Sequence, residues 1–514
     1  MKRNLFKRLF PLMLIACMSI GLMSGCGSNS ADKSDSDNKS GETRDSLTIA
    51  LSSEPNYIST CDHDSLVAVQ MNYMVFNGLM RIDMETLSPV CDLAESYSQD
   101  SDLEWTFKLR EGVKFHNGEE FTAEDVVATI AFAQSYPAST AYTANISEVK
   151  AVDPYTVKIN TSSPTPNLLF DLGYHFNFIL PKSLIEAGND FNTNPIGTGP
   201  YKFVEWEKGN FLTFEAFEDY FDSTRAANIP NVKYVIIPEG STRTMALESG
   251  QVDFIFETPS TDINRLRDND SIVVEEIASV ENFSLYVNCL NGPFVDANLR
   301  NAVSYALNRE EIIYGALGGF ATPSYSVVSA GYAEYSDANA VTYDLDKAKE
   351  YLAAWGGDPS TVTLDIVCSN ETKLAIATIM MNQLAELGIT VTTNTMDLAA
   401  YLEAMTTPDI NSAIESWSPA NAFTYVTRFH SDRRGNTPAS MSDAKMDEMV
   451  EEMRVCMDDD KRAELITDII LYADELSGRI PLYLVNYYRS HSSDLTNVVC
   501  SATGYVDVPL MQWK

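Results

Sequence analysis

The chain has 514 residues, of which 45% are hydrophobic, so it can bury a sizeable core in two or three domains rather than in one. Its 36 Lys and Arg residues face 72 Asp and Glu residues, which gives a formal net charge of −36. That charge argues against binding to nucleic acid, and against binding to anionic lipid through protein charge; its plainest meaning is solubility outside the cell.

Residues 1–25 have the layout of a secretory signal peptide. Met1–Arg8 carries four cations and no acid, and the apolar run Leu9–Met23 that follows is short for a membrane span. The run ends in a Met-Ser-Gly-Cys sequence that resembles the bacterial lipobox, although Met23 stands where that motif prefers Leu. The resemblance implies lipidation of Cys26 and cleavage just before it. The mature chain would then carry 32 cations and 72 acids, a net charge of −40.

Residues 26–46 contain little that a core could bury. Ser, Asp, Asn, Gly and Lys dominate this stretch, and such a composition predicts a disordered tether. A tether that follows a lipidated Cys26 would let the folded body hang clear of the membrane, and several acyl chains on one residue give stable anchoring. We therefore expect a lipid-anchored protein on the outer face of the cytoplasmic membrane.

The folded body begins with strand patterns. Ser46–Leu51 alternates apolar and polar residues and predicts a first strand. Thr106–Arg110 alternates in the same way; Gly112–Phe115 follows it, and His116–Gly118 is a turn marked by its Asn-Gly pair. Further along, Met245–Ser249 is typical of a helix that ends at a glycine, and Val252–Phe256 is typical of the strand that follows it.

Helix starts in the body are marked by capping residues. Thr122 opens a capping box in which Asp replaces the usual Glu, and Asp296 precedes an apolar repeat at helical spacing. Asp344 opens a helix that Gly356-Gly357 would end. The acidic run Asp458–Asp460 indicates a helix N-terminus, where the helix dipole favours negative charge. Strands and helices mix without strict alternation, which predicts a large α/β protein of two lobes.

Motifs that carry chemistry are sparse after the signal peptide. Six widely spaced cysteines follow Cys26 without a C-x-x-C pair, so we expect free buried thiols rather than a zinc framework or disulfides. The five histidines form no H-E-x-x-H pattern, and no G-x-S-x-G or Cys–His signature of a hydrolase occurs. Gly197–Pro200 is read as a tight turn, because no Gly-Lys-Ser/Thr follows it. We expect no metal site, no cofactor and no catalysis.

Several longer motifs follow one another in a fixed order. They are Asn77–Arg81, Asp92–Ser96, Trp105–Gly118, Phe121–Val126, Ala151–Val157, Pro195–Tyr201, Asn298–Ala302 with Asn308–Glu310, and Ile480–Tyr483. This order resembles the bacterial extracellular solute-binding proteins of family 5, the peptide- and nickel-type binding components of ATP-driven importers. The resemblance covers nearly all of the mature body, and it identifies the family rather than the ligand.

The resemblance implies a fold and its division into lobes. The expected fold is an α/β, periplasmic-binding-protein-like clamshell of two lobes, which two chain crossings join and which closes on its ligand. An extra subdomain is inserted into the first lobe. In this sequence the insert would span 61–184. The first lobe would comprise 47–60, 185–278 and 478–514, and the second lobe 279–477.

The resemblance also implies where the ligand binds. Three segments match the walls of the family's cleft, and they give the candidate residues Glu54, Tyr57, Tyr286, Asn288, Glu415, Trp417, Ser418 and Asn421. Peptide binders of the family carry an Asp three residues after the Trp, which pairs with the free amino group of the peptide. Here Ala420 stands at that position. An extended peptide could still be held by main-chain hydrogen bonds, and the aromatic residues could stack on a sugar or a blocked peptide.

The function implied is an extracytoplasmic substrate-binding component of an ATP-driven importer that captures oligopeptides or a similar small organic solute. Its partners would be the ligand, two permease subunits and two cytoplasmic ATPases, with membrane contact through the lipid anchor, and the chain would be a monomer. A binding protein for nickel–chelate complexes, sugars or opine-like compounds is the alternative within the class. An exported hydrolase or an adhesin is the alternative from a different class, with no sequence feature in its favour.

Overall fold

The computed structural model describes residues 44–61, 65–405, 407, 410–433 and 442–514. The expected signal peptide 1–25, the lipidation site Cys26 and most of the expected tether lie outside the described residues. No helix among the described residues is long and apolar enough to cross a membrane.

The folded body starts slightly before the end of the expected tether. Arg44 pairs with Asp253 and also lies over the ring of Trp513, 3.7 Å from its centroid. Residue 46 is already the first residue of a strand. Residues 44–46, which composition assigned to the tether, therefore belong to the folded body, because Arg44 contacts Asp253 and Trp513.

Most strands belong to one mixed sheet, which has eleven strands within the described chain. In spatial order the main path is β15 (Thr390–Thr395), β14 (Thr363–Cys368), β16 (Ser412–Trp417), β12 (Ile272–Val287), β17 (Arg479–Ser492), β11 (Phe254–Ile255), β1 (Ser46–Leu51), β10 (Asn231–Ile236), β9 (Phe211–Ala216) and β8 (Tyr201–Glu207). The remaining strand, β13 (Ala321–Pro323), pairs with β17. The first predicted strand, β1, is confirmed, whereas β11 is shorter than the predicted strand over 252–256.

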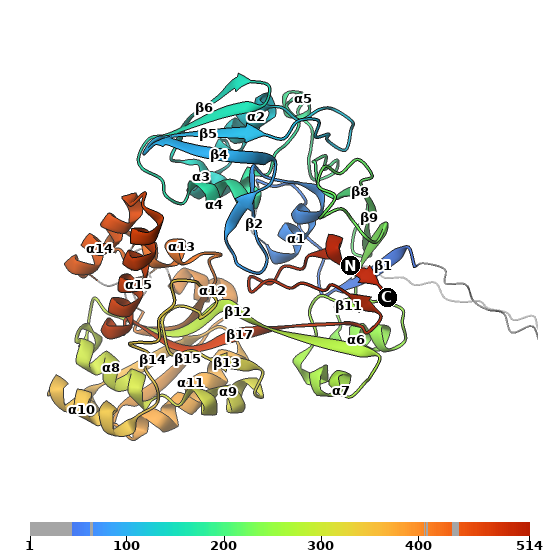
Figure 1. Cartoon of the computed structure of the whole chain (residues 1–514). Coiled ribbons are helices and arrows are strands. Elements are labelled where there is room, and N and C mark those ends of the chain that lie inside the picture. The colour runs from blue at the N-terminus through green and yellow to red at the C-terminus, as the bar shows by residue number, and fades with distance from the viewer. Residues whose placement is uncertain (1–43, 62–64, 406, 408–409, 434–441) are drawn as a thin grey trace, which may run out of the picture. The chain divides into compact units, whose positions relative to one another are not determined.

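The long strands β12 and β17 join the two ends of this sheet (Figure 1). They pair in an antiparallel manner, and their register shifts between Ala278 and Asn282. On one side of this shift β17 pairs with β11, and on the other side β12 pairs with β16. The shift therefore separates a first lobe, built on β1 and β8–β11, from a second lobe, built on β14–β16. Because both strands are central, β17 buries residues on both of its faces, including the whole of 479–484.

A separate antiparallel sheet lies in the segment that was predicted as the insert. Its spatial order is β4 (Ala94–Ser101), β5 (Glu104–Leu109), β7 (Thr156–Thr161) and β6 (Ile146–Asp153), and a hairpin is formed by β2 (Met80–Ile82) and β3 (Pro89–Cys91). The inner face of the sheet buries Trp105 and Phe107 against Val126 and Ile130 of α2. The other helices of this region are α1 (Leu66–Val75), α2 (Ala123–Gln134), α3 (Thr140–Thr143), α4 (Leu168–Gly173) and α5 (Lys182–Glu186).

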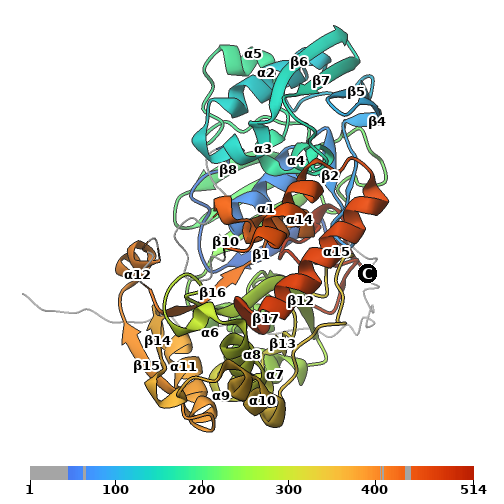
Figure 2. The same ribbon diagram turned by 90° about the vertical axis from the view of Figure 1, so that its left-hand side faces the viewer.

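The remaining helices belong to the two lobes. The first lobe holds α6 (Gly240–Glu248) and α7 (Ile263–Arg267), and a small sheet pairs β18 (Leu495–Thr496) with β19 (Gln512–Trp513). In the second lobe a large core joins the sheet to α8 (Ala297–Ala306), α9 (Arg309–Leu317), α10 (Leu345–Trp355) and α11 (Glu371–Ala385). A second cluster joins α13 (Ala422–Val426), α14 (Ala444–Val455) and α15 (Asp459–Leu476), of which α14 and α15 lie side by side in Figure 2. The helix α12 (Leu398–Ala404) follows β15.

The predicted helix caps are confirmed. The main-chain N–H of Thr122 donates to the Asp125 carboxylate at 2.8 Å, which completes the capping box of α2. Asp296, Asp344 and Asp458 each accept a hydrogen bond from a backbone N–H in the first turn of the helix that they open, namely α8, α10 and α15. These local signals fixed the helix starts because a cap satisfies backbone donors that the helix itself leaves without partners.

The Gly197–Pro200 segment needs its glycines for a different reason from the one predicted. Neither Gly197 nor Gly199 has a positive φ. A side chain at either position would collide with the backbone of Val75, because the two segments touch and the Gly199 N–H donates to the Val75 carbonyl at 2.8 Å. The glycines therefore allow close approach of two backbones rather than a left-handed turn.

Cysteine thiols and possible metal ligands are the groups in the described residues from which a disulfide or a metal site could form. Six cysteines have free thiols, and they are Cys61, Cys91, Cys289, Cys368, Cys456 and Cys500. Within the described ranges no three His, Cys, Asp or Glu side chains are placed to hold a metal ion. The predicted α/β class is confirmed, while the exact lobe boundaries stay a prediction.

Candidate functional site

Two neighbouring cavities lie where the insert faces the second lobe. The larger one, called the Trp417 cavity, measures about 760 Å³ and is lined by residues from 141–171 and from 417–479. The smaller one, called the Tyr332 cavity, measures about 410 Å³. Both are lined by Pro166, Asn167 and Phe423, so they adjoin. Their volumes are typical of sites for small organic ligands.

Trp417, the last residue of β16, lines the larger cavity. The guanidinium of Arg428 lies over its indole ring, 2.9 Å from the ring centroid. The indole Nε1 is buried and has no hydrogen-bond partner within the described part of the chain. Since a buried N–H without an acceptor costs free energy, this group is suited to donate to a bound solute.

Arg479, the first residue of β17, lines the same cavity although it is only 6% exposed. Its guanidinium carbon lies 5.1 Å from the ring centroid of Tyr286 and 5.0 Å from that of Phe429. Burial would lower the pKa of Arg479, but Tyr286 and the hydrogen-bonded Tyr425 raise that pKa further, so the net shift is upward. The cavity wall therefore contains a permanently charged guanidinium.

Asp171 on α4 supplies a carboxyl group to the opposite wall of this cavity. Asn167 Nδ2 donates to this carboxyl at 2.8 Å, and the Oδ1 of Asn167 accepts from Asn421 Nδ2 at 2.7 Å. Burial raises the pKa of Asp171 well above its usual range, and the bond from Asn167 offsets only part of that rise. A chain of hydrogen bonds thus runs from the second lobe to an acid on the insert.

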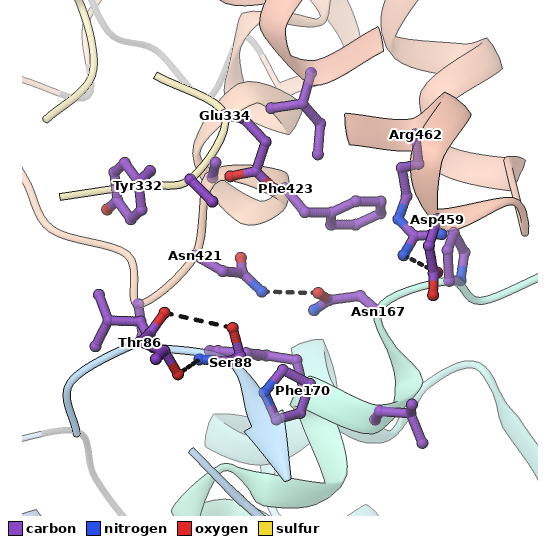
Figure 3. A pocket seen from close by; sticks show the side chains of 18 of the residues that line it. Thr86, Ser88, Asn167, Phe170, Tyr332, Glu334, Asn421, Phe423, Asp459 and Arg462 are labelled. Atoms are coloured by element: carbon purple, nitrogen blue, oxygen red, sulfur yellow. Dashed lines mark hydrogen bonds and ion pairs between the residues drawn. The ribbon is translucent and has the colours of Figure 1, made fainter. Parts of the chain in front are cut away.

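The Tyr332 cavity is bounded by the same Asn421–Asn167 contact (Figure 3). Figure 3 also shows Glu334 and Phe423 on the second-lobe side, with Asp459 paired to Arg462 at the start of α15. The Tyr332 hydroxyl donates to the Pro419 carbonyl, and this hydrogen bond holds the loop that follows Trp417 in place. Several polar side chains in the walls of this cavity therefore bond to one another.

The predicted residues of the first lobe lie outside both cavities. Glu54 accepts hydrogen bonds from Trp206 Nε1 at 3.2 Å and from the Gly209 N–H at 2.8 Å. Tyr57 is 44% exposed. Neither residue lines the Trp417 or the Tyr332 cavity. Their assignment to the ligand stays a prediction.

Three of the predicted residues on the second lobe lie in or near its sheet. Tyr286 is buried beneath Arg479, and Asn288 is buried with its Nδ2 donating to the Ile410 carbonyl at 2.9 Å. Glu415 pairs with Lys373 at 3.1 Å. These contacts stabilise the second lobe, and only the first of them adjoins the wall of a cavity.

The remaining predicted residues follow β16. Ser418 is exposed, whereas Trp417 and Asn421 line the cavities. Asn421 also caps α13, since its Oδ1 accepts from the Thr424 N–H at 2.8 Å. The structure therefore brings together Trp417 and Asn421 from the prediction, with Tyr286 behind the wall.

Sequence reasoning found Trp417 but missed the other polar and charged residues of this cavity, among them Asn167, Asp171, Arg428 and Arg479. Two of them had a signal in the sequence. Arg479 is a lone cation at the entry of an apolar strand, and Asp171 is a lone acid within an apolar helix. Such residues conflict with their local pattern, and that conflict is typical of functional positions.

Ala420, which stands where the family resemblance places an acid, lines the Tyr332 cavity. It packs against an aromatic and aliphatic cluster on the insert that includes Phe170, Tyr174 and Phe176. An acid at this position would face that cluster and lose its hydration, so the apolar residue suits its surroundings.

Comparison with known proteins gives a consistent class. Residues 88–436 match the model of the bacterial extracellular solute-binding proteins, family 5. The oligopeptide-binding protein AppA of Bacillus subtilis (strain 168) is 26% identical over 486 residues, which cover 87% of this chain and 88% of AppA. The glutathione-binding protein GsiB of Escherichia coli (strain K12) is 29% identical over 361 residues, covering 68% of this chain and 69% of GsiB. The structure of HbpA2 from Haemophilus parasuis superposes with a TM-score of 0.83 at 20% identity, covering 91% of this chain and 100% of HbpA2.

The chain belongs to the bacterial extracellular solute-binding proteins of family 5. It is a solute-binding component of an ATP-driven importer and not an enzyme, as the sequence predicted, and it works outside the cytoplasm. The two-lobed fold predicted from the resemblance is confirmed.

The position of Trp417 leads to a first test. Trp417→Ala should weaken binding of the solute recovered from the wild-type protein at least tenfold, because a loss of about 1.4 kcal/mol of aromatic contact corresponds to that factor. The affinity is measured by titration calorimetry, and the melting temperature by circular dichroism should stay close to wild type. Trp355→Ala on α10, which lines neither cavity, is the matched control. Unchanged affinity of Trp417→Ala would remove the indole from the site.

Proposed function

We propose that this chain captures short peptides in the Trp417 cavity and delivers them to its importer. The supporting observation is that the cavity is lined by groups suited to both ends of a peptide, with the carboxyl of Asp171 on the insert and arginines on the second lobe. A peptide is a zwitterion that carries an ammonium group and a carboxylate, so it could satisfy both. The names of the relatives AppA and GsiB, an oligopeptide binder and a glutathione binder, point the same way.

Native mass spectrometry of residues 44–514, a compact unit of the chain, tests this proposal. We expect bound material that separates on denaturation into a ladder of peptide masses of a few residues. A single non-peptide mass would contradict the peptide assignment and leave the solute-binding class intact.

The alternative within the class is a nickel–chelate, sugar or opine-like solute. A chelator added before the measurement separates a metal chelate from a peptide. Removal of free metal leaves peptide binding unchanged and abolishes binding of a metal chelate. Trp417 could stack on a sugar, but a sugar would leave the charged groups of the cavity without partners.

We propose that Asp171 pairs with the free amino group of the peptide, in place of the acid that is missing at position 420. An ammonium group beside Asp171 favours its ionised form, whereas burial in the empty cavity favours the protonated form. Binding should therefore release a proton, and affinity should fall as the pH falls through the raised pKa of Asp171. Calorimetry of the recovered solute in buffers of different ionisation enthalpy measures the proton release.

Two variants make this prediction specific. Asp171→Asn should lower affinity about tenfold or more and abolish the pH dependence, since it removes the charge and keeps the shape. Asp92→Asn is the matched control, because Asp92 is also a buried acid, with its pKa raised to about 6, and it lines neither cavity. A proton release that persists in Asp171→Asn would assign it to another group.

The lipid anchor at Cys26 is part of the same proposal. A mature chain held at the outer face of the membrane by this residue would keep the solute near the permease subunits and their ATPases, and a single copy is sufficient for that delivery. Cys26→Ser should remove the mass of the diacylglyceryl group from the intact protein and leave residues 1–25 attached, as intact-mass spectrometry would show. A diacylglyceryl mass that survives the substitution would contradict lipidation at this position.

A further inference from the structure

Arg479 is a buried cation with no carboxylate partner among the described residues. Its guanidinium Nε and Nη1 are buried and have no hydrogen-bond partner in the described chain. The groups that act on its charge are Tyr286, Tyr425 and Cys289, and none of them is a carboxylate. Removing an unpaired charge from water costs free energy. The buried guanidinium therefore destabilises the protein unless an anion pairs with it.

The same cavity is locally rich in positive charge. Its lining includes Arg428, Arg454 and Arg479 but a single acid, Asp171, on a chain with twice as many acids as cations. Arg454 is paired with Asp432 at 3.0 Å, so that charge is already balanced. A recess with this lining attracts anions from solution, since its low-dielectric walls focus the positive potential.

A second arginine on the same strand shows what a purely structural residue looks like. Arg489 is also buried on β17 and also lies between two rings, those of Phe256 and Tyr487. Its Nη2, however, donates to the Gly504 carbonyl at 2.8 Å, and the residue lines neither cavity. Arg479 has a similar aromatic surrounding, but it faces a cavity and has no main-chain acceptor for its guanidinium among the described residues.

We infer that Arg479 anchors a carboxylate of the transported solute in the Trp417 cavity. A carboxylate has several lone pairs and accepts from more than one donor at once, and a charge-assisted bond of this kind is among the strongest in proteins. The inference rests on the proposed function and deepens it. The chemical class of the solute is a peptide with a free carboxylate, which its C terminus or an acidic side chain could supply.

The test uses the full mature lipoprotein in detergent and three pools of tri- to pentapeptides. The first pool has free C termini and no acidic side chain, the second has amidated C termini and no acidic side chain, and the third is amidated with one Glu per peptide. Affinity-selection mass spectrometry measures what the protein retains. We expect the second pool to bind at least about 50-fold more weakly than the better of the other two, because it leaves the guanidinium unpaired.

Two substitutions connect this preference to the residue. Arg479→Met keeps a long apolar side chain between Tyr286 and Phe429 and should reduce the preference to about threefold or less. Its melting temperature should equal or exceed that of the wild type, because an unpaired buried charge is removed. Arg489→Met, the matched control, should lower the melting temperature and keep the preference for carboxylates.

The outcomes separate the inference from the proposed function. Preference for the first pool assigns the carboxylate to the C terminus, and preference for the third assigns it to a side chain. Equal binding of all three pools to the wild type, or an unchanged preference in Arg479→Met, overturns the inference and leaves peptide binding in place. If the wild type binds none of the pools, the proposed function fails, and the inference fails with it.

Discussion

The pairing of β12 with β17 is the interaction on which the site depends. The register of these strands places Arg479 opposite Tyr286, and β16 adds Trp417 opposite Asn282 on the other edge of β12. Two residues that lie far apart in sequence are thus held in one hydrogen-bonded frame. A slip of one residue in either pairing would turn the side chain to the other face of the sheet. The face of the sheet from which the indole and the guanidinium project therefore follows from backbone pairing, and the packing of the side chains sets their final positions.

The same strand pair also joins the two lobes, and its regular register is interrupted between Ala278 and Asn282. An interrupted ladder resists rotation less than a continuous one, so this is where hinge motion would concentrate. On the far side of the cavities the Asn421–Asn167 bond connects the second lobe to the insert. Rotation at the register shift would stretch or break this single bond. A solute bound in the cavity would add to this bond in holding the two walls together.

The fold could be predicted largely from the sequence because its signals are local or belong to long motifs. Asp296 and Asp344 cap their helices through contacts within one turn, and such contacts are visible in a short window of sequence. The site could be predicted only in part. Trp417, which was predicted from a motif, lines the larger cavity, whereas Asp171 and Arg428 reach that cavity through the packing of the insert against the second lobe. That packing depends on contacts between distant segments, which no local pattern contains.

The acid that the family resemblance places at position 420 and the carboxyl of Asp171 can be compared within one fold. In the peptide binders that this chain resembles, the acid follows the tryptophan on the second lobe. Here that place holds Ala420, which packs against the apolar cluster of Phe170 and Tyr174 on the insert. The carboxyl of Asp171 is on the same short helix as Phe170, so one helix supplies both the apolar partner of Ala420 and an acid for the cavity. The proposed role of Asp171 would keep one acid in the region, while the apolar contact of Ala420 with the insert costs no desolvation of charge. The ammonium group of a solute would then be held by the insert and its carboxylate by β17, so that the peptide itself would connect the two sides of the cleft.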